Sequence, residues 1–254
     1  MISMTAQYQD TRKGTPKLNA LFKSINVPVP YFFENEQDIK TEDNFTKVFG
    51  TGFNNIKYCE DFLTQEEVDE YMSFVKKYPE IEGREHCYPL HLADHSINND
   101  PDYLGFCKRM GTKMIEKAKQ EWQTPMSNLD NQHCMAVVHP TGTYLKPHTD
   151  ILDIHYENND PDHDDGMSYE DQRKTFPNLW SGHLAILAYP NDDFEGGYFY
   201  FPDFDYYFKP KARSILMFPG GLHYIHGVTP ITKGTRYTLS QWCLFDIYKN
   251  PDAV

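Results

Sequence analysis

Two segments in the first half of the chain repeat apolar positions every three to four residues, the spacing of a helix that buries one face. The first follows a short predicted strand and a capping box formed by Thr64 and Glu67. The second is expected to begin at Asp100, which caps the helix, with Pro101 in its first turn. The apolar stripes are Val68, Tyr71, Met72, Val75 and Tyr78 in the first helix and Tyr103, Cys107, Met110, Met114, Ala118 and Trp122 in the second. We interpret both stripes as core packing.

From residue 132 onward the pattern changes to short runs that alternate or remain apolar, as strands do. Turns containing glycine or proline separate these runs. The predicted strands are 132–139, 143–151, 183–189, 197–201, 213–218, 222–229 and 236–247. Many short strands with glycine corners favour a mainly β (α+β) fold with a jelly-roll core of two sheets, buttressed by the two preceding helices.

The remaining segments suggest the domain organisation. Residues 1–52 are polar and contain prolines, so we expect an N-terminal extension that packs along the core as irregular structure. Residues 53–254 are expected to form one domain. An acidic insertion at 153–180 interrupts it, with eight acidic residues against two basic ones within 153–175. A connection of this length beside a candidate ligand is typical of an active-site lid.

Charge and cysteine content narrow the function further. The formal net charge of −13 disfavours a nucleic-acid binder, because phosphate backbones require a positive surface. The five cysteines are odd in number and include no CxxC pair, so neither a zinc knuckle nor a disulfide framework is predicted. Free thiols are typical of a reducing compartment, and the N-terminal segment has no apolar leader and no run of membrane-spanning length. We therefore expect a cytoplasmic protein without a membrane partner.

His148, Asp150 and His226 are the candidate metal ligands and catalytic residues. Alternate side chains of a strand share a face, so His148 and Asp150 are expected to point the same way. His226 is expected to come from another strand, and His223, three residues earlier, to face the opposite side. Two imidazoles and one carboxylate leave coordination positions open, as in non-haem Fe(II) oxygenases. Arg236, ten residues after His226, offers a guanidinium fork that suits a dicarboxylate co-substrate.

Several motifs follow one another in a specific order along the chain. They are residues 144–150 (YLKPHTD), 194–197 (FEGG), 216–219 (LMFP), 226–228 (HGV) and 236–240 (RYTLS), preceded by 58–64 (YCEDFLT). Together these motifs resemble the 2-oxoglutarate- and Fe(II)-dependent dioxygenases, in particular their prolyl 4-hydroxylase-like branch. The resemblance covers residues 56–248 and implies a double-stranded β-helix core.

The same resemblance implies the cofactors and the roles of four further residues. The metal would be Fe(II), the co-substrates 2-oxoglutarate and O2, and ascorbate the reductant. Arg236 would pair with the distal carboxylate of 2-oxoglutarate, where many members of the branch have lysine. Tyr189 and Ser240 stand where the family places hydroxyls near that carboxylate. His139 stands where related enzymes often have tyrosine, and we expect it to contact the co-substrate or the substrate, or to end a strand.

The substrate stays open at this point. Peptidyl proline is the leading substrate by resemblance, and a free amino acid or another small molecule is the alternative. A non-catalytic barrel that only binds, or a zinc hydrolase, is disfavoured because the three ligands and Arg236 are all present and no general base is obvious nearby. Repair of alkylated nucleic acid is disfavoured by the charge and by the lack of a basic, aromatic-rich stripe. The sequence does not indicate an oligomeric state.

Overall fold

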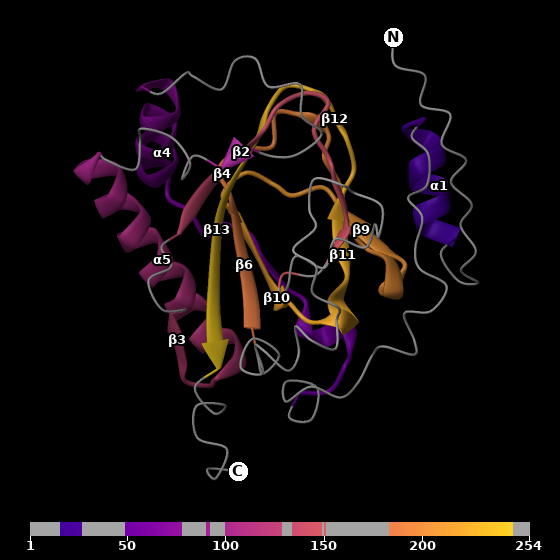
Figure 1. Cartoon of the computed structure of the whole chain (residues 1–254), viewed down its shortest axis with the longest axis horizontal. Coiled ribbons are helices and arrows are strands. Elements are labelled where there is room, and N and C mark those ends of the chain that lie inside the picture. The colour runs from indigo at the N-terminus through magenta and orange to yellow at the C-terminus, as the bar shows by residue number, and fades with distance from the viewer. Residues whose placement is uncertain are drawn as a thin grey trace, which may run out of the picture.

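A computed structural model of the chain describes residues 16–26, 49–77, 90–91, 100–128, 134–148, 150 and 183–245 (Figure 1). The acidic insertion predicted at 153–180 lies outside these residues. The α-helices in the described parts are α1 (Pro16–Ser24), α4 (Gln65–Lys77) and α5 (Pro101–Trp122). The strands there are β1 (Lys57–Cys59), β2 (Leu90–His91), β3 (Met126–Asn128), β4 (Met135–His139), β5 (Leu145–His148), β6 (His183–Tyr189), β7 (Glu195–Gly196), β8 (Phe199–Phe201), β9 (Tyr206–Phe208), β10 (Ser214–Pro219), β11 (His226–Val228), β12 (Ile231–Lys233) and β13 (Arg236–Phe245).

The larger sheet contains seven strands in the order β1-β10-β6-β13-β4-β2, with β3 paired to the end of β13. All of its neighbouring strands are antiparallel. Strand β6 explains why part of the sequence does not alternate: Leu184 to Tyr189 are all buried, because both faces of this strand are covered. A strand covered on both sides reads as a continuous apolar run, which is what the sequence has here.

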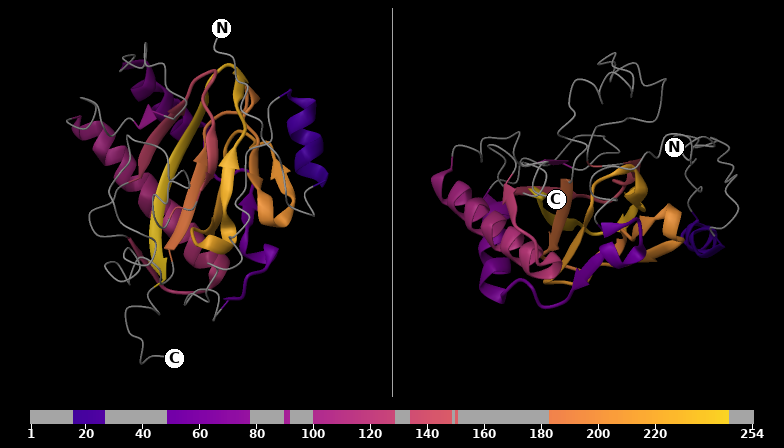
Figure 2. Two further views of the ribbon diagram at one scale, coloured as in Figure 1. Left: turned by 45° about the vertical axis from the view of Figure 1, so that its right-hand side comes forward. Right: turned by 90° about the horizontal axis from the view of Figure 1, so that it is seen from below.

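The smaller sheet has the order β5-β11-β8-β9, and β12 and β7 form a separate pair. Its inner face packs against the larger sheet. The ring of Phe218 on β10 lies 5.5 Å from Phe199 and 5.2 Å from Phe201 on β8, measured between ring centroids. Figure 2 shows the two sheets side by side in two further views. Two facing antiparallel sheets confirm the predicted jelly-roll, or double-stranded β-helix, core.

Helices α4 and α5 cover the other face of the larger sheet, on the side away from α1 (Figure 1). The alternation along β13 accounts for this packing. Tyr237 meets Tyr71 of α4 at 6.0 Å, and Phe245 meets Trp122 of α5 at 6.2 Å between ring centroids. These residues lie on the odd-numbered face of β13, so the even-numbered residues, beginning with Arg236, face the smaller sheet.

Both helices begin as the sequence predicts. The backbone N–H of Thr64 donates to Glu67 Oε2 at 2.8 Å, and the N–H of Glu67 donates to Thr64 Oγ1 at 3.2 Å. These two bonds form the predicted capping box. The carboxylate of Asp100 accepts from the backbone N–H groups of Asp102 at 3.0 Å and Tyr103 at 3.4 Å. Each cap satisfies donors that have no partner within the helix itself.

Several predicted strands are shorter than expected, and two of these differences change where candidate ligands lie. Strand β5 ends at His148, so Asp150 lies beyond the strand rather than on it. Residues Leu222–Tyr224 form a 3₁₀ turn, and β11 begins only at His226. The two- and three-residue strands β2, β3, β7, β9 and β12 were not predicted as separate elements, because runs so short show no readable alternation.

The N-terminal extension contains a helix where irregular structure was expected. The apolar side chains of α1 are buried against the outer face of the smaller sheet; they are Leu18, Leu21 and Phe22. Phe22 meets Tyr200 of β8 edge-on at 5.3 Å. The carboxylate of Asp205 accepts from the N–H groups of Lys17 at 3.1 Å and Leu18 at 3.0 Å, so a residue almost two hundred positions away caps this helix. The spacing of the three apolar residues is helical, and it is the signal that was available in the sequence.

Four of the five cysteines lie in the described part of the chain, and Cys59, Cys107, Cys134 and Cys243 carry thiols there rather than disulfides. Burial raises the pKa of the Cys107 thiol to about 11, so this group is protonated and unreactive near neutral pH. In the part of the chain that the structure describes, no helix combines the length and the apolar character needed to cross a membrane.

Candidate metal centre

Two histidines face each other across neighbouring strands. His148 is the last residue of β5, His226 is the first residue of β11, and the strand register pairs them directly. Directly opposed residues of an antiparallel pair project from the same face. Their ring centroids are 4.4 Å apart, so the sheet brings together two imidazoles that are distant in the sequence.

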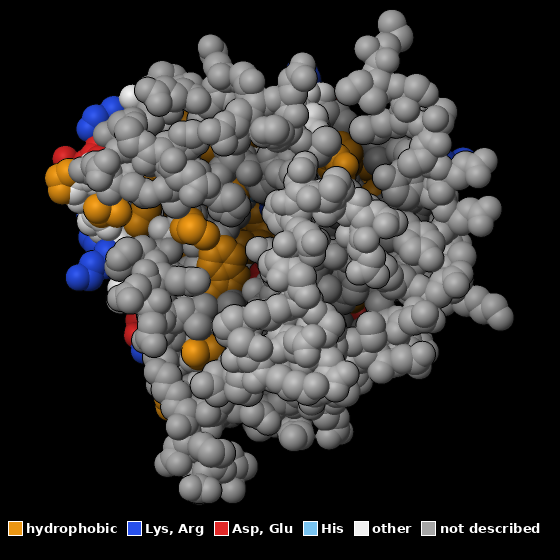
Figure 3. Space-filling model, viewed as in Figure 1, with side chains coloured by type: hydrophobic (Ala, Val, Ile, Leu, Met, Phe, Trp, Pro, Cys, Tyr) orange, Lys and Arg blue, Asp and Glu red, His pale blue; other side chains and the backbone are white. Residues whose placement is uncertain are grey.

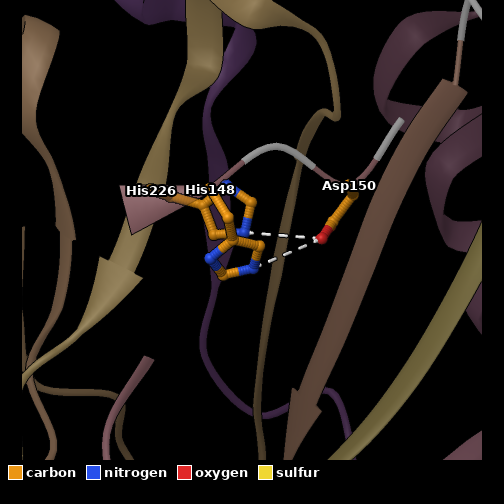
Figure 4. A group of neighbouring side chains, drawn as sticks. All are labelled: His148, Asp150 and His226. Atoms are coloured by element: carbon orange, nitrogen blue, oxygen red, sulfur yellow. Dashed lines mark ion pairs between the residues drawn. The ribbon is translucent and has the colours of Figure 1, made fainter. Parts of the chain in front are cut away.

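Asp150 completes the group from a bend after β5 (Figure 4). Its backbone N–H donates to the carbonyl of Gly220 at 3.2 Å, which ties the bend to the chain segment that leads into β11. Asp150 Oδ1 lies 3.7 Å from His148 Nε2 and 3.6 Å from His226 Nε2. The three residues therefore meet as predicted, although Asp150 lies beyond the end of β5 and not on the strand as expected. The bend, and not strand alternation, turns its carboxylate toward the imidazoles.

His226 is held firmly in this position. Its Nδ1 lies 3.0 Å from the carbonyl oxygen of Tyr224, and donation of the Nδ1 proton to that carbonyl leaves the lone pair of Nε2 on the side of Asp150. Phe199 stacks on the ring at 5.2 Å, and Phe218 meets it edge-on at 4.5 Å. Packing and one hydrogen bond thus select a tautomer and an orientation suited to binding a metal.

His223 does not belong to the group of potential ligands. Strand alternation predicts that His223 lies on the same strand as His226 but on the opposite face. In the structure His223 lies in the 3₁₀ turn before β11.

The donor set fits a divalent transition metal with open positions. Among the described residues, His148, Asp150 and His226 form a group whose candidate ligand atoms all lie within 4.8 Å of one another. Separations of 3.6 and 3.7 Å are too long for hydrogen bonds and leave room for an ion bound at roughly 2.0–2.2 Å by each ligand. The side chain of His226 is 3% exposed and that of His148 is 31% exposed, so the group is closed on one side and accessible on the other.

Arg236 projects from the face of the larger sheet that looks toward this group. Phe218, which contacts His226, pairs with Ala185, and Ala185 pairs with Trp242. Paired residues share a face, and Trp242 and Arg236 are an even number of residues apart on β13. Arg236 therefore lies on the same inward face as Phe218.

The guanidinium of Arg236 is buried without an acidic partner among the described residues. The residue is 1% exposed, and no described carboxylate lies within ion-pair distance of it. Its Nη1 lies 3.1 Å from Nε2 of His139, and its Cζ lies 5.1 Å from the ring centre of Tyr189. Burial lowers the pKa of Arg236, and the hydroxyl of Tyr189 opposes this effect. An arginine nevertheless keeps its charge, so an anionic ligand is the missing complement.

Two buried hydroxyl groups, those of Tyr189 and Thr238, lie on the same inward face as Arg236. Within the described part of the chain, Arg236 Nε, the Tyr189 hydroxyl and Thr238 Oγ1 are buried and have no hydrogen-bond partner. Burial raises the pKa of Tyr189, with Arg236 opposing, so its hydroxyl is protonated and able to donate. Ser240 shares this face but is four residues from Arg236, roughly 13 Å along the strand. Thr238, two residues from Arg236, is the nearer hydroxyl, and alternation from Arg236 was the signal by which the sequence could have identified it.

No protein-family model matches the chain. Prolyl 3-hydroxylase 2 of Homo sapiens is 40% identical over 76 residues, which are 28% of this chain and 11% of that protein. The protein of the same name from Gallus gallus is 38% identical over 76 residues, again 28% of this chain and 11% of that protein. The chain thus spans about a tenth of the length of the curated relatives that it matches. Both are prolyl hydroxylases by name, in agreement with the resemblance of the sequence motifs.

The chain is also similar, at low sequence identity, to two solved structures. The viral collagen prolyl hydroxylase of Paramecium Bursaria Chlorella virus-1, in a 2OG complex, is 16% identical with a TM-score of 0.49, covering 75% of this chain and 96% of that chain. The prolyl hydroxylase of Trichoplax adhaerens, in complex with a hypoxia inducible factor peptide fragment, is 15% identical with a TM-score of 0.49, covering 87% of this chain and 94% of that chain. We assign the fold from the strand order and register given above.

Proposed function

We propose that the chain is an Fe(II)- and 2-oxoglutarate-dependent dioxygenase that hydroxylates a C–H bond. The observation that carries this proposal is the pairing of two features on the facing sheets. One is an open set of two imidazoles and one carboxylate, and the other is a buried guanidinium without a described acidic partner. The overall reaction converts 2-oxoglutarate, O2 and R–H into succinate, CO2 and R–OH. The bound iron would supply the activation of O2.

In this proposal the residues divide into two groups with separate tasks. His148, Asp150 and His226 hold the metal and leave its remaining positions to the co-substrates. Arg236 binds the distal carboxylate of 2-oxoglutarate, and its burial strengthens the pairing because little water competes for the charge. Tyr189, which contacts Arg236, is the second donor that we assign to that carboxylate.

Thr238 and Ser240 are the two hydroxyl candidates on β13. We assign Thr238 to the distal carboxylate, because its buried hydroxyl has no partner among the described residues and lies one inward position from Arg236. A charge-assisted bond to a carboxylate would remove the cost of burying that hydroxyl. Ser240, at roughly twice the separation along the strand, is assigned to the same inward face at a greater distance from the distal carboxylate.

For the substrate we propose a prolyl residue of a peptide, with a small molecule as the alternative. The named activity of the partial relatives supports this choice. Figure 3 shows hydrophobic side chains between the grey atoms near the middle of the face that Figure 1 views, and apolar surface suits contact with a proline ring. We further propose ascorbate as the reductant and a cytoplasmic location, which fits the free thiols of the described cysteines.

Succinate formation tests the reaction class. The protein is loaded with Fe(II) without oxygen, then given 2-oxoglutarate, ascorbate, O2 and a set of proline-containing peptides. We expect succinate from the wild type and none from His226→Ala, while His223→Ala, a matched control three residues away, keeps its activity. Equal succinate from wild type and His226→Ala would refute the assignment of the metal site. A zinc-loaded protein that hydrolyses substrates without consuming O2 would refute the reaction class.

A further inference from the structure

We propose that His139 is a positioning residue that orients Arg236 for the co-substrate, rather than a residue that touches the co-substrate itself. This inference rests on the proposed function, since it concerns how the 2-oxoglutarate anchor is held. The two side chains form a buried pair on the inward face of the larger sheet. His139 is 2% exposed and Arg236 is 1% exposed.

Strand pairing places the two residues together. His139 ends β4 and Arg236 begins β13, and the antiparallel register sets them directly opposite each other. Directly opposed residues share a face, with Cβ atoms roughly 4.5–5.5 Å apart. The register of the two strands therefore brings the side chains into contact, and Arg236 Nη1 lies 3.1 Å from His139 Nε2.

The chemistry of the pair defines the direction of the hydrogen bond. Arginine has donors and no acceptor, so Arg236 must donate and the Nε2 of His139 must accept. A protonated His139 would have no lone pair at Nε2 and would place a second cation beside a buried guanidinium that has no described acidic partner. His139 therefore acts as a neutral acceptor with its proton on Nδ1.

This bond leaves the functional edge of the guanidinium available. Nη1 is engaged by His139, whereas Nε has no hydrogen-bond partner among the described residues. Tyr189 lies against the guanidinium, with Cζ 5.1 Å from the ring centre, and limits its other movements. A carboxylate can then bind the edge that includes Nε in the two-point geometry that arginine prefers. Without His139 the guanidinium can rotate, and part of the binding free energy is spent on ordering it.

The predicted consequence concerns only one end of the co-substrate. 2-Oxoglutarate carries a distal carboxylate, and 2-oxopentanoate has the same five-carbon 2-oxo acid chain with a methyl group in its place. Loss of the bond from His139 should weaken 2-oxoglutarate about tenfold to about a hundredfold, the range of one charged hydrogen bond. Binding of 2-oxopentanoate, which does not use Arg236 as a charge partner, should change less than about twofold.

Three substitutions separate positioning from general structural support. Glutamine places its amide oxygen near the position of Nε2, asparagine reaches only the position of Nδ1, and leucine has no acceptor. Dissociation constants are measured by calorimetry on the full chain loaded with Mn(II) under argon, so no turnover is required. We expect the Kd of His139→Gln for 2-oxoglutarate to lie within about threefold of the wild-type value. The Kd values of His139→Asn and His139→Leu should rise about tenfold to about a hundredfold, the effect of losing one charged hydrogen bond.

The possible outcomes are distinct. Loss of 2-oxoglutarate affinity in the asparagine and leucine variants, with recovery in the glutamine variant, supports the inference. Unchanged affinity in His139→Leu, or equal losses for both 2-oxo acids in all variants, overturns it while the proposed function stands. A wild-type protein that binds neither 2-oxo acid with Mn(II) overturns the proposed function and this inference with it. Thermal unfolding of each variant establishes that its fold is intact before binding is compared.

Discussion

Replacement of Arg236 by methionine should separate co-substrate binding from stability. Methionine is a flexible apolar side chain that fills the space of the arginine stem. The wild-type protein buries a guanidinium with 1% exposure and no described acidic partner. Exchanging buried charged groups for apolar residues of similar volume is often neutral or stabilising by about 1–4 kcal/mol. Loss of the charged hydrogen bond to His139 removes about 1.5–3 kcal/mol. Because these terms oppose each other, the free energy of unfolding without ligand should stay within about 3 kcal/mol of the wild type.

The effect on 2-oxoglutarate should be much larger. Removing one partner of a buried charge pair costs about 2–5 kcal/mol of binding free energy. At about 1.4 kcal/mol per tenfold, this is a loss of about 30-fold to about 4,000-fold in affinity. A ligand concentration of about 100 times the wild-type Kd stabilises the wild type by about 2.7 kcal/mol and the variant by less than about 0.9 kcal/mol. The assay is chemical denaturation of the Mn(II)-loaded protein with and without 2-oxoglutarate.

The matched control is Arg213→Met. Arg213 carries the same side chain on an outer turn, where its side chain is 37% exposed and pairs with Asp61 at 2.7 Å. Its variant should keep the full ligand-induced stabilisation. If Arg236→Met also kept it, the carboxylate anchor would lie elsewhere. A loss of more than about 4 kcal/mol in the ligand-free Arg236 variant would mean that the guanidinium is a structural group with an internal partner.

Three further substitutions test other parts of the structure. Thr238→Val removes a buried hydroxyl without a described partner, so it should raise the free energy of unfolding by about 1 kcal/mol in denaturation experiments and weaken 2-oxoglutarate binding in calorimetry. A destabilised variant would contradict this prediction. Gly227→Ala would place a Cβ 2.5 Å from the ring of Tyr200, so the variant should lose about 1–3 kcal/mol of unfolding free energy and bind Mn(II) more weakly at the adjacent ligand His226. An unchanged Tm would mean that β8 and β11 separate easily to make room for the methyl group. Asp205→Ala removes the cap of α1, so it should lower the free energy of unfolding by about 1 kcal/mol and leave the Mn(II) affinity, measured by titration, unchanged. Weakened Mn(II) binding would show that α1 supports the metal site.

Much of the architecture could be predicted because local chemistry dictates it. The caps at Thr64 and Asp100 depend only on neighbouring residues, and both helices begin where these caps are. The longer strands were identified because their runs of apolar residues exceed the length of a turn. The helix α1 was missed, although its apolar spacing was present, because its cap comes from Asp205 on a distant loop. Short strands such as β12 exist only because a neighbouring strand offers backbone partners.

The sequence by itself determined which chemical groups are available and in what order: His148, Asp150, His226 and Arg236 were identified from residue type and spacing. Only the tertiary structure decided how they meet. Strand register set the two imidazoles opposite each other, and a bend tied to Gly220 directs the carboxylate. The register of β4 against β13 made His139 a partner of Arg236. The physical reason is that side-chain type is a local property, whereas pairing between strands depends on contacts between segments far apart in the chain.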